Sequence, residues 1–256
     1  MADFFSTRES RAVASRALAA GFAGSMLGLL STVLDPLAAT AGARPDARVQ
    51  EILDGNELFI DQKQARVNQL AYRPEVITTR NSRGSLALSN GAQARISKNS
   101  QLRLGADCAR LQKGQMLVSG KQDTCVGSIR MSVRGTHYIV EVLEDETTEV
   151  AVLDGMMTFS PSLGESGKPS VVPLAANREV LRFAADGQLQ GRRCLVSSDY
   201  RRYLGGNLLQ GFFFPLPKVQ ALASMLVGSV PGGDLLLGLL RTGGSRGLVP
   251  LPLLPF

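Results

Sequence analysis

Short runs in which apolar and polar residues alternate fill the middle of the chain. The clearest are Ile129–Val133 and Ile139–Val142, and similar runs cover 86–88, 94–96, 102–104 and 150–152. A period of two places the apolar side chains on one face of a β-strand and the polar side chains on the other. No stretch between residues 49 and 160 has the spacing of an amphipathic helix, so the pattern predicts strands throughout this region.

Turn-forming dipeptides separate these runs. Asp54-Gly55, Asn90-Gly91 and Asp154-Gly155 are pairs that accept the positive φ angles of tight hairpins. Short strands that recur about every eight to twelve residues are typical of all-β sandwiches, barrels and solenoids. We therefore predict an all-β domain over residues 44–160.

The composition changes after this domain. Residues 161–203 combine a Gly/Ser/Pro linker with two further predicted strands at 170–174 and 179–183, and we assign them to a β extension. Residues 204–256 form an apolar tail rich in Gly and Pro, whose apolar pieces are shorter than the ~20 residues of a membrane helix. At most short helices are expected there. The tail packs onto the β domain, contacts a membrane surface or binds a partner, and the sequence leaves these three interpretations open.

The first 43 residues have the pattern of an export signal. Arg8, Arg11 and Arg16 precede the apolar run 17–34, and small residues follow as far as Ala43. This order is typical of a secretory signal peptide, although residues 17–34 are also close to the length of an uncleaved membrane anchor. Both interpretations export the rest of the chain, so we expect a periplasmic or cell-envelope location.

The charge distribution argues against a nucleic-acid partner. The net charge is +6, but residues 44–160 carry 15 basic and 14 acidic side chains, and the excess lies after residue 160. Proteins that bind nucleic acids usually gather basic residues on one face, with aromatic residues between them. The predicted β domain is close to neutral, and we expect no binding of nucleic acid.

In an exported chain the cysteines predict a disulfide. Cys108 and Cys125 lie 17 positions apart and flank a predicted strand at 115–118. Disulfides persist in oxidising compartments, and a loop of this size adds about 3 kcal/mol by restricting the unfolded chain. The alternative is a pair of buried thiols. Cys194 remains as a free thiol or an intermolecular link.

The sequence contains no recognisable catalytic or metal-binding motif. It has no Gly-rich phosphate loop, no G-x-S-x-G and no Cys-x-x-Cys, so we expect no enzyme activity, no cofactor and no metal. The single histidine, His137, has no evident acid partner and is interpreted as an ordinary strand residue. Glu144, Asp145 and Glu146 are assigned to a solvated hairpin loop. A carbohydrate-active enzyme that uses paired acids such as Glu141 and Glu144 or Asp145 is the weaker alternative.

The middle of the chain resembles the FecR domain, the extracytoplasmic part of the ferric-citrate-type regulators. The residues that carry the resemblance are Glu75–Thr79, Ser85–Leu104, Val133–Val140 and Thr148–Gly155. The most recognisable signature is Val133, Arg134, Gly135 and Thr136, followed by the turn at Asp154 and Gly155. The resemblance implies a FecR-like antiparallel β domain, sandwich or solenoid-like, over somewhat less than half of the chain.

Two features depart from those regulators. Arg130-Met131 stands where family members often carry Thr-Pro. About sixteen residues precede the apolar run, which is too few for a folded anti-sigma segment, and the tail does not resemble a receptor-docking domain. The resemblance is therefore not extended to the sigma-factor role of those regulators.

The signature itself predicts a local irregularity. Glycine inside a strand usually marks a bulge or a close backbone approach, so Arg134–Thr136 is interpreted as a corner of the sheet, with a ligand contact as the alternative. Arg134 is expected to pair with Glu141 or Glu149.

Together these features predict a non-enzymatic, exported FecR-domain protein that acts as a binding or sensory module of the bacterial cell envelope. Its partner would be an envelope protein or polymer, with membrane contact through the tail as a further possibility. The alternative is a membrane-anchored signalling regulator of the ferric-citrate type.

Overall fold

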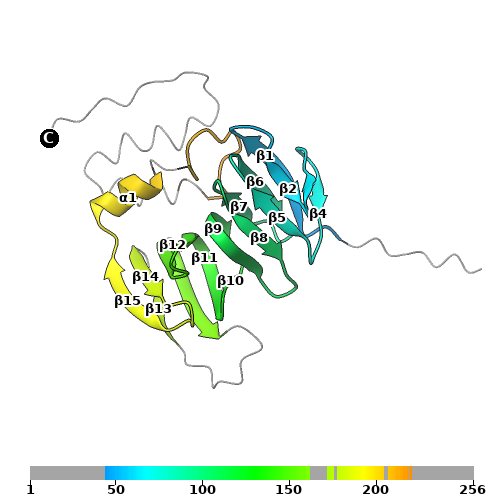
Figure 1. The fold of residues 1–256 in the computed structure, drawn as a ribbon. Coiled ribbons are helices and arrows are strands. Elements are labelled where there is room, and N and C mark those ends of the chain that lie inside the picture. Colours follow the sequence, from blue (N-terminus) through cyan, green and yellow to red (C-terminus); the bar gives the residue numbers. More distant parts are fainter. Residues whose placement is uncertain (1–43, 162–171, 176–177, 205–206, 219, 221–256) are drawn as a thin grey trace, which may run out of the picture. The chain divides into compact units, whose positions relative to one another are not determined.

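The computed structural model describes residues 44–161, 172–175, 178–204, 207–218 and 220 (Figure 1). These residues form fifteen strands and, within the described ranges, one helix. The first eight strands are β1 (Ala47–Leu53), β2 (Leu58–Ile60), β3 (Lys63–Gln64), β4 (Leu70–Ala71), β5 (Val76–Thr79), β6 (Arg83–Leu88), β7 (Gln93–Ile96) and β8 (Gln101–Leu104). The others are β9 (Ala109–Gly120), β10 (Thr124–Val126), β11 (Ile129–Val142), β12 (Thr148–Pro161), β13 (Val172–Ala175), β14 (Glu179–Phe183) and β15 (Leu189–Cys194). The helix is α1 (Ser197–Leu204).

The strands belong to one sheet that folds over on itself. Its main path runs β15-β14-β12-β11-β10-β9-β7-β6-β1-β4, and β2, β3, β5 and β8 form a branch that leaves from β9. The prediction of an all-β fold is confirmed. The strands pair antiparallel as expected, with one parallel pairing between β10 and β9.

Long strands connect the two parts of the sheet. In β9, residues 109–113 pair with β8, whereas residues 116–119 pair with β7. The strand changes neighbours at Gly114, which has a φ of +82° and lies against Ser100. A Cβ atom at position 114 would come within 2.3 Å of the Ser100 hydroxyl oxygen, so the crossing requires glycine.

One hydrophobic core fills the space inside the folded sheet. It joins Leu58 and Ile77 from the branch to Leu86, Met116 and Tyr138 from the main path. Tyr138 is fully buried, and its hydroxyl group lies 2.7 Å from Thr124 Oγ1 and donates to the Gln122 carbonyl at 2.6 Å. The apolar positions of the alternating runs thus supply the core, as a period of two requires.

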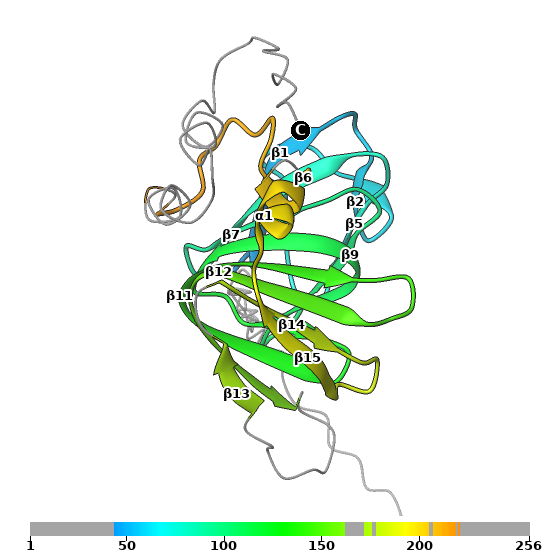
Figure 2. The ribbon, with the colours of Figure 1, turned by 90° about the vertical axis from the view of Figure 1, so that its left-hand side faces the viewer.

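A second, smaller core lies on the opposite face of the same strands. Leu117, Ile139 and Ala151 belong to this outer face, and side chains that follow β15 cover it. The covering residues are Leu195, Tyr200, Tyr203, Leu208, Leu209 and Leu216. The helix α1 supplies Tyr200 and Tyr203 and is drawn on the near side of the sheet in Figure 2. Packing onto the β domain, one of the three interpretations of the tail, is therefore present for Leu208, Leu209 and Leu216.

The disulfide prediction is confirmed. Cys108 and Cys125 are joined with a Cα–Cα distance of 5.8 Å, and the bridge ties the start of β9 to β10. Cys194 is a free, exposed cysteine at the end of β15.

The remaining sequence assignments have different outcomes. The strand predicted at 179–183 is β14, and the one predicted at 170–174 is described from Val172, as β13. The export signal in residues 1–43, the linker at 162–169 and the apolar sequence from residue 221 onward lie outside the described residues. Within the described part of the chain, no helix has the length and apolarity that a bilayer crossing needs.

Candidate functional site

A row of buried polar side chains crosses the outer face of the sheet. We define this polar face as Glu51, Arg83, Arg95, Ser119 and His137, which come from β1, β6, β7, β9 and β11. These residues occupy the polar positions of alternating strands, which the sequence pattern assigns to solvent. None of them is more than 8% exposed, because residues 207–218 lie across them. We call residues 207–218 the C-terminal strap.

The two arginines hold the strap by its main-chain carbonyl groups. Arg83 donates from Nη1 to Asn207 O at 2.5 Å and to Gln210 O at 2.7 Å. Arg95 donates to Leu208 O at 3.2 Å and to Phe214 O at 2.7 Å. A buried guanidinium group needs several acceptors, and carbonyl oxygens of the strap supply them here.

Acidic partners balance part of this buried positive charge. Asp54 accepts two bonds from Arg83, and the arginine lowers the pKa of that carboxyl group. The carboxylate of Glu51 accepts from the main-chain nitrogens of Phe213 at 2.6 Å and Phe214 at 3.3 Å. Burial lowers the pKa of Arg95 to about 10, and the nearby charge of Glu51 opposes that effect.

One aromatic side chain of the strap is enclosed between the arginines. The ring centroid of Phe212 lies 4.3 Å from Arg95 Cζ and 5.4 Å from Arg83 Cζ. Arginine guanidinium groups stack favourably on aromatic faces. The Phe212 ring therefore gives both guanidinium groups a packing surface, although it carries no charge to balance theirs. The arrangement thus binds a chain segment by its main-chain carbonyl and amide groups and by one aromatic side chain.

Ser119, His137 and Asp154 have the composition of a hydrolytic triad and lie opposite one another on neighbouring strands. Their geometry is different from that of a triad. Ser119 Oγ donates to Pro217 O at 2.8 Å, and His137 Nε2 lies 2.9 Å from the same carbonyl oxygen, to which it donates. The hydroxyl group and the imidazole are therefore both occupied by the strap.

His137 lies near an acidic residue, Asp154, which the sequence did not make evident. Its Nδ1 lies 3.6 Å from Asp154 Oδ2 and has no hydrogen-bond partner, and the side chain is 2% exposed. Burial lowers the pKa of His137, although the Pro217 carbonyl and Asp154 act in the opposite direction. The sequence could not pair these two residues, because a register shift between β11 and β12 decides that they face each other.

The FecR signature lies where β11 changes neighbours. Val133 is buried in the core and Arg134 is exposed. Residues 129–131 pair with β10, whereas residues from Thr136 onward pair with β9, and the register against β12 shifts between Arg134 and His137. The predicted bulge is therefore present. Asp154 and Gly155 were predicted to form a hairpin turn, but both lie within β12. Gly155 nevertheless has the positive φ, +94°, that such a turn would need.

Three acidic residues on and beside the β11–β12 hairpin each have a different partner. Asp145 accepts two bonds from Thr147, which are the main cause of its lowered pKa. Glu141 accepts from Gln115, and Glu149 pairs with Arg202. The predicted pairing of Arg134 with Glu141 or Glu149 was therefore wrong.

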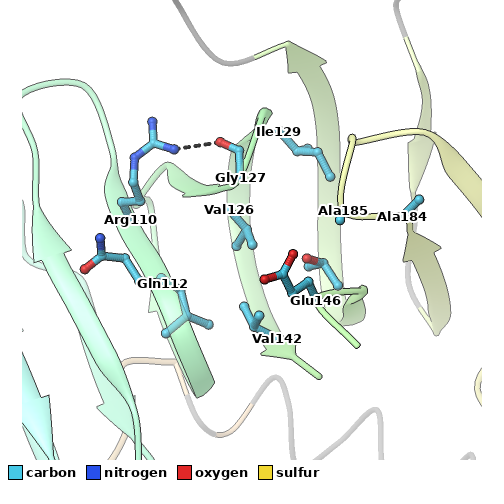
Figure 3. A pocket seen from close by; sticks show the side chains of 11 residues that line it. Arg110, Gln112, Val126, Gly127, Ile129, Val142, Glu146, Ala184 and Ala185 are labelled. Carbon is cyan, nitrogen blue, oxygen red and sulfur yellow. Dashed lines mark hydrogen bonds between the residues drawn. The ribbon is translucent and has the colours of Figure 1, made fainter. Parts of the chain in front are cut away.

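A hollow of about 310 Å³ opens where the core reaches the surface (Figure 3). Val126, Ile129 and Val142 form apolar parts of its lining, and the carboxylate of Glu146 points toward them. Arg110 lies at the rim and donates to Gly127 O at 2.7 Å. Among the described residues, no group of three or more His, Cys, Asp or Glu side chains could hold a metal ion.

Comparison with known proteins finds one family model that matches part of this domain. The model described as "FecR protein" matches residues 75–158, which run from the start of the β5 region into β12. The match confirms the resemblance to the FecR domain that the sequence shows over these residues. None of the curated proteins matches the chain.

Two solved structures are similar to the chain. Both are crystal structures described as "a putative anti-sigma factor from Parabacteroides distasonis ATCC 8503". Each has 15% sequence identity and a TM-score of 0.41, and they cover 59% and 57% of this chain. The matched regions span 72% and 70% of the respective relatives.

Proposed function

We propose that this protein is an exported, non-enzymatic module of the bacterial cell envelope that binds a protein or polymer partner through its FecR domain. The observation that carries the proposal is the FecR family match over residues 75–158. The order of basic, apolar and small residues at the N-terminus supports export, and so does the disulfide between Cys108 and Cys125.

The contacts of the polar face support a role in binding. Ser119 and His137 contact a main-chain carbonyl group of the strap, and Glu51 contacts two main-chain amides. A hydrolase needs the hydroxyl group of its serine to face the imidazole and an open site for substrate. In this protein the same groups are buried beneath residues 207–218.

Among the described residues, no strand pairs with the outer edge of β15, which is thus a candidate binding edge. This strand pairs with β14, and all six of its residues are exposed. An exposed edge offers main-chain donors and acceptors to an extended segment of another protein, which can add to the sheet as a further strand. Arg192 and Arg193 on β15 are engaged with Glu179 and Asp199, so these charges are already compensated.

The alternative function is transmembrane signalling by a regulator of the ferric-citrate type. The sequence feature that favours it is the apolar run 17–34, which an uncleaved anchor would need. Mass spectrometry of the native protein from fractionated cells distinguishes the two. A new N-terminus near Gly42 in the periplasmic fraction supports the proposal, whereas an intact Met1 in the membrane fraction supports the alternative.

Photo-crosslinking in cells tests the binding role. A photoreactive residue at Gln190, on the β15 edge, should capture a defined envelope component. The matched control is the same residue at the exposed Val67, which lies between β3 and β4. Equal capture patterns at the two positions, or none at either, would contradict binding at this edge.

A further inference from the structure

The strap presents two adjacent aromatic side chains to solvent. Phe213 is 63% exposed and Phe214 is 43% exposed. Their rings form an edge-to-face pair with centroids 5.5 Å apart. By contrast, Phe212 and Leu216 of the same segment are buried against the sheet.

Buried charged groups fix the main chain of this aromatic pair. Glu51 accepts from the amides of Phe213 and Phe214, and Arg95 donates to the Phe214 carbonyl at 2.7 Å. Glu51 and Arg95 are themselves at most 8% exposed, so they belong to the rigid sheet. The fold therefore fixes the main-chain positions from which the two exposed rings project.

Exposed aromatic rings on a fixed backbone are suited to contact with lipid. Phenylalanine is among the residues that peripheral proteins bury at the boundary between headgroups and acyl chains. Aromatic side chains also supply a large apolar area. The strap contains no acidic residue, and its one charged residue is the exposed Lys218. A basic residue beside an apolar pair complements anionic headgroups.

The sequence that follows the strap has the same character. Of the 36 residues from 221 to 256, only Asp234, Arg241 and Arg246 are charged. The aromatic pair thus stands at the start of a long apolar sequence with a net positive charge. This combination favours a lipid surface over the charged or mixed surface of a soluble partner.

We infer that Phe213 and Phe214 insert into the interfacial layer of an anionic lipid bilayer. This inference goes beyond the proposed function, because contact with lipid requires neither a protein partner nor the open edge of β15. A failure of the lipid contact leaves the binding role of the FecR domain untouched. A failure to capture a partner likewise says nothing about lipid.

The absence of tryptophan from the chain allows a specific test. Phe213→Trp in the full chain introduces a single reporter, and the matched control is Val67→Trp, at a position that is 52% exposed. Each variant is mixed with vesicles of phosphatidylcholine and phosphatidylglycerol. We expect a blue shift of the emission and quenching by brominated lipid for Trp at 213, and neither effect for Trp at 67.

Other outcomes overturn the inference. If the protein floats with vesicles while the emission of the Phe213→Trp variant stays unchanged, another segment makes the contact. If the emission shifts with protein concentration in the absence of vesicles, the aromatic pair meets a second copy of the chain. A third check is the double variant Phe213→Ser/Phe214→Ser, which should keep its thermal midpoint because both rings are exposed.

Discussion

The guanidinium group of Arg95 lies 4.3 Å above the ring centroid of Phe212 and donates to two strap carbonyl groups. These residues are 117 positions apart in the chain, and their contact joins the FecR sheet to the C-terminal strap. Arg95→Ala removes the ring contact and leaves the carbonyls of Leu208 and Phe214 without these donors. Since a buried acceptor without a partner costs about 1–3 kcal/mol, the free energy of unfolding should fall by about 2–3 kcal/mol.

Urea denaturation measures this loss. Arg103→Ala is the matched control, because Arg103 is exposed on β8 and its replacement should change the free energy of unfolding by less than about 0.5 kcal/mol. Equal losses for the two variants would show that the buried contacts of Arg95 contribute nothing specific.

His137 should make the stability of the protein sensitive to mild acid. Burial lowers its pKa in the folded state below the ordinary value of 6.5, so the unfolded chain binds the proton more readily. The stability contributed by the neutral imidazole is therefore fully present above pH 6.5 and is lost as the pH falls from 6.5 toward the lowered pKa. His137→Gln keeps a donor for the Pro217 carbonyl but does not titrate.

The free energy of unfolding at pH 7.5 and pH 5.5 tests this dependence. The parent protein should lose more stability between these values than the His137→Gln variant does. An identical loss in both proteins would mean that the imidazole is not the group that responds.

The disulfide between Cys108 and Cys125 should contribute substantially to stability. Its closed loop spans 17 positions, and Cys108→Ser/Cys125→Ser should lower the free energy of unfolding by about 3 kcal/mol. Cys194→Ser, at the exposed free cysteine, is the control and should have almost no effect. The parent and both variants are compared by chemical denaturation under oxidising conditions. Equal denaturation midpoints for all three would show that the disulfide does not stabilise the protein.

Asp199 should stabilise the start of α1. Its carboxylate accepts from the Val196 amide at 3.0 Å and pairs with Arg193, and the bonds from Arg193 are the main cause of its lowered pKa. Asp199→Ala should cost about 1 kcal/mol, as the loss of a helix cap does. Hydrogen exchange should become faster in α1 but not in β11. Glu144→Ala, at an exposed turn residue, should leave the exchange in α1 unchanged.

The alternating pattern predicted most of the strands, because a period of two follows from the local geometry of a strand with one buried face. The run at 179–183 coincides with β14, and the Asp54-Gly55 turn has the positive φ angles that its sequence favours. Leu117 and Ile139 mark the limit of this reasoning. The alternation shows that a strand has two faces, but it does not show that a distant segment covers the second one.

The candidate site was missed for a related reason. Arg83 and Arg95 look like ordinary solvent-facing positions, because the groups that they bind are main-chain carbonyls 113 to 127 positions away. Every residue has a main-chain carbonyl group, so the residue types in a sequence do not show which carbonyl accepts a hydrogen bond. The pairing of His137 with Asp154 was equally hidden, since it depends on a local shift of register.

The attachment of the strap through its backbone also affects how this protein can diverge. Substitutions at Asn207 or Gln210 leave the carbonyl groups that Arg83 binds in place. Related chains can therefore keep the same covered sheet while this segment changes its exposed side chains. The buried positions Leu208, Leu209, Phe212 and Leu216 remain constrained by packing. Relatives with the same covered face would then be recognised by Arg83, Arg95 and Glu51. The segment that covers these residues could differ at all of its exposed positions.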